Sequence, residues 1–149
     1  MTGDFERAMR FVARWEGGLV YHPSDPGGRT NRGVTQKTYD AWRDRRHLPH
    51  RDVSELEDAE EHSIYSEEYW YPAGCDKLAW PLCLVHFDTA VNLGVQRARG
   101  LVAAAGGDVG AYLTKRRAYY TTLAQVRPKL AVFLRGWLNR VEALEAEAV

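Results

Sequence analysis

The fold is decided by residues 5–34, which read FERAMRFVARWEGGLVYHPSDPGGRTNRGV. The first half of this stretch carries apolar side chains at helical spacing and predicts an amphipathic helix. Its apolar face consists of Phe5, Ala8, Met9, Val12 and Trp15. Gly17 and Gly18 should end the helix, because glycine readily adopts the positive φ of a helix C-terminus. Residues 19–34 contain two prolines and three glycines, so we expect an ordered loop or a short hairpin there.

Helical spacing also dominates the sequence that follows this loop. A second helix should begin after Thr35 and carry Tyr39. The capping-box pattern of Ser54 and Glu57 predicts a third helix that ends near Tyr69.

Residues 82–93 predict a fourth helix that is apolar on nearly every side, with Pro81 suited to its first position. Such a helix lies at the centre of a small domain. The helices that follow are separated by Gly94, by the pair Gly106-Gly107 and by Pro128. The whole pattern predicts a mostly α protein with a small irregular or β-containing lobe around residues 17–35.

Length and composition fit one globular domain over all 149 residues. Apolar residues make up 45% and charged residues 27% of the chain, a balance that excludes a disordered tail protein. No apolar run is long enough to cross a bilayer, so we expect no membrane span. The first residues lack a basic segment followed by an apolar one, and we therefore expect no signal peptide.

The charges are unevenly spread, although the formal net charge is zero. Residues 52–68 hold eight acids and no Lys or Arg, whereas residues 97–140 hold nine bases and one acid. A basic surface suggests an anionic partner, and Lys115, Arg116 and Arg117 form its densest cluster. No aromatic-basic groove motif accompanies the cluster, so a wall-binding or merely solvated face is preferred over a nucleic-acid site.

Neither a metal site nor a disulfide framework is indicated. Cys75 and Cys83 would form one bridge if the segment between them turned back, but two reduced thiols are the preferred interpretation. His47 and His50 have a ligand-like spacing but no further ligand nearby. We predict no metal and no organic cofactor.

Glu16 is the residue best placed for acid catalysis. It ends an apolar helix beside Trp15 and precedes two glycines that let another molecule approach the backbone. The negative end of the helix dipole and burial beside an indole both favour the protonated carboxyl, and so should raise the pKa of Glu16. A general acid that works near neutral pH needs such a raised pKa.

A second carboxylate follows at Asp25, across a loop rich in turn residues. Glycoside hydrolysis uses two such groups: one protonates the leaving oxygen, and the other stabilises positive charge, attacks the sugar or activates water. The hydroxyl of Thr30 is able to hold such a water. Alternatively, Asp25 caps a turn, because Ser-Asp-Pro-Gly is a good turn sequence by itself.

These residues form a pattern that resembles glycoside hydrolase family 108, which contains phage and bacterial muramidases of the lysozyme superfamily. The matching runs are Glu16-Gly17-Gly18, DPGGRTNRGVT over residues 25–35, Tyr65 with Tyr69-Trp70, and FDTAVNLG over residues 87–94. The resemblance covers most of the chain to about residue 105. It departs after Gly18, where the family commonly has an aromatic residue; here Leu19 follows and the aromatic is Tyr21.

The resemblance implies an α+β lysozyme-like fold, with Glu16 as the catalytic acid and the glycine-rich segment facing the substrate cleft. We expect a catalytic core over residues 1–95 and a basic helical part over residues 96–149. Asp88 and Asn92 share one helix face, where polar groups either bond inside the protein or line the cleft. Aromatic residues at helical spacing either stack on sugars or belong to the core. The expected substrate contacts are Tyr21, Asn31, Tyr39, Asp88 and Asn92.

The predicted function is that of a peptidoglycan hydrolase. The expected reaction is that of an N-acetylmuramidase, which cuts the β-1,4 bond between N-acetylmuramic acid and N-acetylglucosamine. The expected partner is bacterial peptidoglycan, with no nucleic acid, and the expected state is a monomer. Without a signal peptide, the protein would be an endolysin that accumulates in the host cytoplasm and reaches the wall after the membrane is permeabilised.

Two alternatives stay open. A lytic transglycosylase would use Glu16 alone and leave an anhydro-sugar. A non-catalytic wall-binding module would keep the fold and bind through its basic half.

Overall fold

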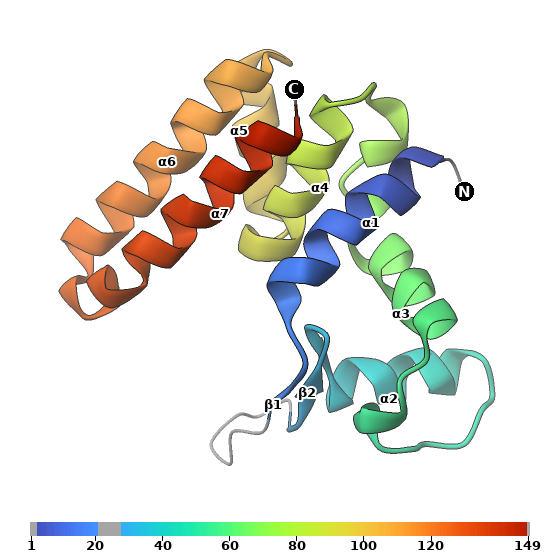
Figure 1. The fold of residues 1–149 in the computed structure, drawn as a ribbon. Helices are drawn as coiled ribbons and strands as arrows, with labels where there is room; N and C mark the ends of the chain where they lie inside the picture. Colours follow the sequence, from blue (N-terminus) through green and yellow to red (C-terminus); the bar gives the residue numbers. More distant parts are fainter. Residues whose placement is uncertain (1–2, 21–27, 149) are drawn as a thin grey trace. The chain divides into compact units, whose positions relative to one another are not determined.

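The computed structural model describes residues 3–20 and 28–148 (Figure 1). Helices dominate this part of the chain, and a small antiparallel sheet follows the first helix. The chain forms two compact units: Met9–Glu68, here the sheet-containing unit, and Met1–Ala8 with Tyr69–Val149, here the helical unit. The predicted mostly α architecture with a small β lobe is confirmed. The expected division at residue 95 does not coincide with the boundaries of these units.

The elements follow one another closely along the chain. In order they are α1 (Gly3–Glu16), β1 (Leu19–Val20), β2 (Thr30–Asn31), β3 (Val34–Thr35), α2 (Gln36–Arg45), η1 (Val53–Glu55), α3 (Asp58–Tyr65), η2 (Ser66–Trp70), η3 (Cys75–Lys77), α4 (Leu82–Leu93), α5 (Val95–Ala105), α6 (Val109–Val126), η4 (Pro128–Phe133) and α7 (Leu134–Glu147). None of the helices in residues 3–20 and 28–148 combines the length and apolar character needed to span a bilayer.

The sheet is built on a tight hairpin between β2 and β3. Asn31 pairs with Val34, and the two residues between them, Arg32 and Gly33, have φ of 53° and 79°. Two positive φ values are typical of the two-residue turns that match the twist of a hairpin. Thr35 then caps α2, because its side-chain oxygen accepts a hydrogen bond from the backbone N–H of Thr38 at 3.1 Å.

The third helix begins later than predicted. Ser54 lies in the short turn η1, where its backbone N–H donates to Asp52 Oδ1 at 2.8 Å. The capping box is formed by Glu57 and Glu60 instead, with the Glu57 N–H donating to Glu60 Oε1 at 3.0 Å. The predicted capping box of Ser54 and Glu57 was wrong, because the same spacing recurs three residues later, with acidic side chains at both positions.

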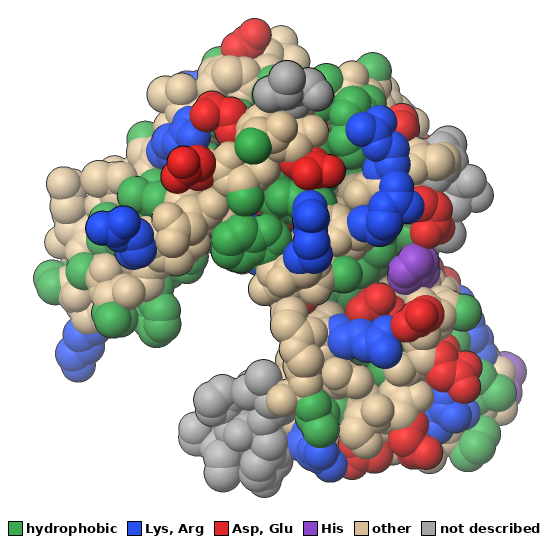
Figure 2. Space-filling view, in the orientation of Figure 1, with side chains coloured by type: hydrophobic (Ala, Val, Ile, Leu, Met, Phe, Trp, Pro, Cys, Tyr) green, Lys and Arg blue, Asp and Glu red, His purple; other side chains and the backbone are tan. Residues whose placement is uncertain are grey.

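The acid-rich segment 52–68 is neutralised inside its own unit. Its carboxylates form ion pairs with arginines that precede it in the sequence, including Glu60 with Arg43 at 2.8 Å and Glu67 with Arg46 at 2.6 Å. Figure 2 shows acidic and basic side chains side by side over this part of the surface. The local excess of acid therefore does not make a negatively charged face.

Helix α4 is the core of the helical unit, as predicted. Cys83, Leu84, Val85, Phe87 and Ala90 are all fully buried. The helix packs against α5, α6 and η3. It starts one residue after Pro81, which precedes the helix as its N-cap. Both cysteines of this unit, Cys75 and Cys83, are free thiols, so the preferred interpretation is confirmed.

His86, also on α4, should make the helical unit sensitive to acid. Its ring is buried between the carbonyl oxygen of Ala73, 2.9 Å from Nε2, and the hydroxyl of Tyr112, 2.8 Å from Nδ1. A carbonyl only accepts hydrogen bonds, so Nε2 donates and Nδ1 accepts in the neutral ring. Burial lowers the pKa of His86, and the unfolded chain therefore binds the proton more readily.

The free energy of unfolding should therefore fall as the pH drops below about 6.5, the ordinary pKa of histidine. We expect His86→Gln to weaken this decrease, and His47→Asn, at an exposed histidine, to leave it unchanged. Urea unfolding at about pH 7.5 and about pH 5.5 measures the difference. The same pH dependence in His86→Gln and wild type would contradict the assignment.

Candidate active site

Glu16 stands where the sequence predicted it, at the last position of α1. Its side chain is half-buried. Gly17 follows with a φ of 71°, which ends the helix in the left-handed conformation that glycine adopts without strain. The carboxyl is therefore held at the end of a regular helix, directly before a glycine turn.

The turn between β2 and β3 approaches this carboxyl closely. A Cβ atom placed on Gly33 would lie 2.8 Å from Glu16 Oε2 and 3.2 Å from Glu16 Cβ, and would also collide with the hydroxyl of Tyr65. Three groups from separate elements thus converge: the acid from α1, the glycine turn and the phenol from α3. Only glycine fits this position, both for its space and for its positive φ.

Tyr65 ties the turn to α3. Its hydroxyl donates to the carbonyl oxygen of Arg32 at 2.6 Å, and the backbone N–H of Arg32 donates to the carbonyl oxygen of Gly18 at 3.3 Å. The turn is thereby fixed both to α3 and to the segment that directly follows Glu16. From the sequence, Tyr65 was part of the family pattern and one of the aromatic residues that either stack on sugars or belong to the core; its role in holding the turn was not predicted.

The substitution Gly33→Ala should lower the activity by more than the backbone strain of an alanine at positive φ explains. We expect a fall in kcat/KM of at least about tenfold, because the new methyl group must displace the Glu16 carboxyl or the Tyr65 hydroxyl. Gly28→Ala is the matched control, since Gly28 has the same φ of 79° but a Cβ there would lie 3.5 Å from Gln36 Cβ, an ordinary contact. Steady-state kinetics on soluble glycan fragments, with circular dichroism for the fold, measures both. An equal loss of kcat/KM in the two variants would show that backbone strain alone causes the loss.

A second carboxyl, Glu61, lies one helical turn before Tyr65 and is 5% exposed. Burial raises the pKa of Glu61, while Arg32, whose Nη1 is 3.8 Å from Glu61 Oε1, and His62 act in the opposite direction. Sequence reasoning counted Glu61 only among the acids of its segment. Its burial comes from the packing of α3, which residue counts do not reveal.

Trp15 differs from the expectation. The indole next to Glu16 was expected to be buried, but it is 38% exposed, and its ring centroid lies 6.4 Å from that of Phe11. It presents an open aromatic surface one residue from the acid. Such a surface is the kind on which a sugar ring stacks.

Tyr39 and Asn31, predicted as substrate contacts, are structural residues. Tyr39 is fully buried, and its hydroxyl donates to Glu60 Oε1 at 2.7 Å and accepts from Arg51 Nε at 2.6 Å. Asn31 is 8% exposed, and its amide donates to the carbonyl oxygen of Val53 at 3.0 Å. Both predictions were wrong because each side chain finds its partner inside the protein.

Asp88, also predicted as a substrate contact, lies in the helical unit and is fully buried between two arginines. Arg116 Nη1 is 2.7 Å from Asp88 Oδ2, and Arg140 Nη2 is 2.8 Å from Asp88 Oδ1. The carboxylate therefore neutralises buried cations, and the prediction of a cleft-lining role was wrong. Asn92, one turn later, is half-buried, and its Oδ1 accepts a hydrogen bond from Tyr120. A substrate contact by Asn92 stays a prediction.

The predicted basic cluster of Lys115, Arg116 and Arg117 does not form one surface. Lys115 is exposed, but Arg116 is fully buried against Asp88. Arg117 forms an ion pair with Glu145 at 3.3 Å. The prediction was wrong because three consecutive residues of a helix point in different directions, and the middle one faces the core.

Two predicted site residues, Asp25 and Tyr21, lie outside the described residues. Thr30 is half-buried on β2, where it pairs with Val20 and Thr35. Successive strand residues point to opposite faces, so Thr30 faces away from the side on which Asn31 is buried. A catalytic role for Thr30 stays a prediction. The described residues contain no cluster of potential metal ligands.

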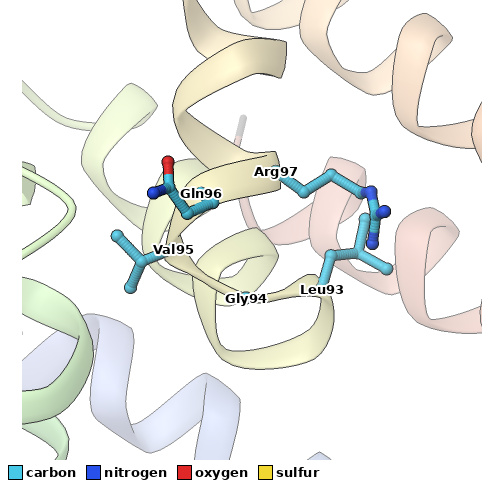
Figure 3. A pocket seen from close by; sticks show the side chains of 5 residues that line it. All are labelled: Leu93, Gly94, Val95, Gln96 and Arg97. Carbon is cyan, nitrogen blue, oxygen red and sulfur yellow. The ribbon is translucent and has the colours of Figure 1, made fainter.

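The helical unit has a hollow of about 530 Å³ at the junction of α4 and α5 (Figure 3). It is lined by Leu93, Gly94, Val95, Gln96 and Arg97. The guanidinium of Arg97 also lies over the ring of Tyr119, 4.8 Å from its centroid.

A half-buried carboxyl at a helix end, set against a glycine turn in a mostly α protein with a small sheet, is the arrangement of a lysozyme-like glycoside hydrolase. Residues 9–94 match the model of the family Glycosyl hydrolase 108, and the chain belongs to this family. The expected family and lysozyme-like fold are thus confirmed.

The solved structure of Brucella abortus SagA is similar to this chain. The two share 27% sequence identity at a TM-score of 0.75, over 98% of this chain and 94% of that one. No curated protein sequence matches the chain. Family membership makes the protein a glycoside hydrolase and supports peptidoglycan as its substrate.

Proposed function

We propose that this protein is an N-acetylmuramidase, which hydrolyses the β-1,4 bond between N-acetylmuramic acid and N-acetylglucosamine in peptidoglycan. The observation that carries the proposal is the convergence of the Glu16 carboxyl with Gly33 and the Tyr65 hydroxyl. Family membership supports the reaction class. The specific bond is inferred from the resemblance of the sequence to muramidases.

In the proposed mechanism, Glu16 is the general acid. Its proton passes to the glycosidic oxygen as the bond to the anomeric carbon breaks, and a water oxygen completes the new reducing end. Tyr65 is a positioning residue, because its hydrogen bond to Arg32 holds the turn against the acid. Asp25, or a water held by Thr30, is the proposed group opposite Glu16. Trp15 offers its exposed ring to a sugar next to the cleavage point.

Purified peptidoglycan tests the proposal. We expect the wild-type protein to clear a peptidoglycan suspension and to release soluble fragments with new reducing ends. A wall-binding module would instead sediment with the peptidoglycan and release nothing. That result would contradict the proposed function.

We also propose the biological setting expected from the sequence, an endolysin that acts as a monomer after its release from the host cytoplasm. Expression in a bacterial host should then be harmless until a pore-forming agent permeabilises the membrane, when the culture should lyse. Lysis at the same rate without the agent would contradict this setting. Sedimentation velocity measures the oligomeric state directly.

A further inference from the structure

The end of the hairpin formed by α6 and α7 exposes three large apolar side chains. Val126 ends α6 and is 71% exposed, while Val132 and Phe133 end η4 and are 77% and 54% exposed. Figure 2 shows hydrophobic and basic side chains gathered at this end of the hairpin, at the lower left. Phe133 is supported by Trp137, whose ring centroid is 5.9 Å away. A cluster of exposed apolar side chains marks an interaction surface.

This hairpin end, residues 126–135, is also basic. Arg127, Lys129 and Arg135 are exposed and form no ion pair with any residue that the structure describes. Residues 109–141 contain no Asp or Glu, so nothing in this stretch of sequence offsets their charge. A hollow of about 420 Å³, lined by Arg127, Pro128, Lys129 and Leu130, lies between two of the cations. Its walls are apolar, so this basic segment also contains an apolar recess.

We propose that the hairpin end docks on an anionic lipid surface. Val126, Val132 and Phe133 enter the boundary between headgroups and acyl chains, and the three cations contact lipid phosphates. Charge complementarity favours this occupant over a second copy of the chain, because two hairpin ends would bring unpaired cations together. A glycan fits less well, because the two most exposed side chains, Val126 and Val132, offer sugar hydroxyls no hydrogen bond and no flat ring for a sugar to stack on. The proposal goes beyond the hydrolase function and does not depend on it.

Vesicle sedimentation tests this docking. The wild-type protein should bind vesicles of equal parts phosphatidylglycerol and phosphatidylcholine at least about tenfold more strongly than vesicles of phosphatidylcholine alone, at low salt. The double variant Val132→Ser, Phe133→Ser should lose at least about tenfold in partition coefficient, because it removes apolar side chains that enter the membrane. Thermal unfolding of each variant checks that the fold is kept.

A charge-matched pair of triple variants separates local docking from general attraction. Arg127→Gln, Lys129→Gln and Arg135→Gln together should weaken binding to the anionic vesicles at least about tenfold. The control removes the same charge from exposed lysines elsewhere in the chain and should bind within about threefold of wild type. Its substitutions are Lys37→Gln, Lys77→Gln and Lys115→Gln.

Three results would overturn the proposal. Equal binding to neutral and anionic vesicles would show that the cations do not contribute to docking. Undiminished binding of the double variant would show that the apolar side chains do not contribute. Absence of vesicle binding, together with a dimer that the double variant abolishes, would assign the hairpin end to a second copy of the chain.

Discussion

Replacement of Glu16 by Gln should lower the rate of peptidoglycan hydrolysis at least about a hundredfold, the usual scale for the loss of a general acid. Gln keeps the size of the side chain but has no proton to give to the glycosidic oxygen. The contact with the turn at Gly33 should survive, so the variant should keep the wild-type fold. Initial rates on purified peptidoglycan, with circular dichroism at matched concentration, measure the two effects separately.

Glu6→Gln is the matched control, because it makes the same chemical change in the first turn of the same helix. It should hydrolyse peptidoglycan at close to the wild-type rate. A folded Glu16→Gln protein with near wild-type activity would end the assignment of Glu16 as the acid. Asp25→Asn should cost less than the Glu16 change.

Asp88→Asn should produce the largest loss of stability. The buried carboxylate contacts both Arg116 and Arg140, and Asn would leave two guanidinium groups in the core without a counter-charge. Burial opposes the charge on Arg116. The neighbouring Asp88 and Tyr120 nevertheless raise the pKa of Arg116, so this arginine stays ionised. Breaking a buried pair of this kind costs about 3–5 kcal/mol in the free energy of unfolding. That is a large part of the roughly 5–15 kcal/mol that stabilises a typical domain.

Urea unfolding of the wild type and the variant measures this loss. Asp76→Asn, at an exposed position of η3, is the control and should change the free energy of unfolding by less than about 0.5 kcal/mol. A loss below about 1 kcal/mol in Asp88→Asn would show that the two arginines do not depend on this carboxylate.

The sequence predicted those parts of the fold that depend on neighbouring residues. The apolar face of α1, its end at Gly17, the start of α2 after Thr35 and the buried helix α4 all arise from patterns within a few residues. Glu16 belongs to the same group, because its position at a helix end before two glycines is visible locally.

The errors concern polar residues whose partners are distant in the sequence. Tyr39 bonds Glu60 across 21 residues, Asn31 bonds Val53 across 22, and Asp88 bonds Arg140 across 52. A polar residue within an apolar pattern is consistent with both a site and a buried pair, and only the three-dimensional packing decides between them. The role of Tyr65 was missed for the same reason, since its partner Arg32 lies 33 residues away.

Digestion of purified peptidoglycan in oxygen-18 water tests the central claim most directly. A hydrolase in which Glu16 protonates the leaving oxygen adds a water oxygen to the anomeric carbon. After immediate borohydride reduction, mass spectrometry should find one heavy oxygen at each new N-acetylmuramic acid end, and no such fragments from the Glu16→Gln protein. Fragments that end in anhydro-N-acetylmuramic acid without heavy oxygen, or the absence of fragments from the wild type, would contradict the account.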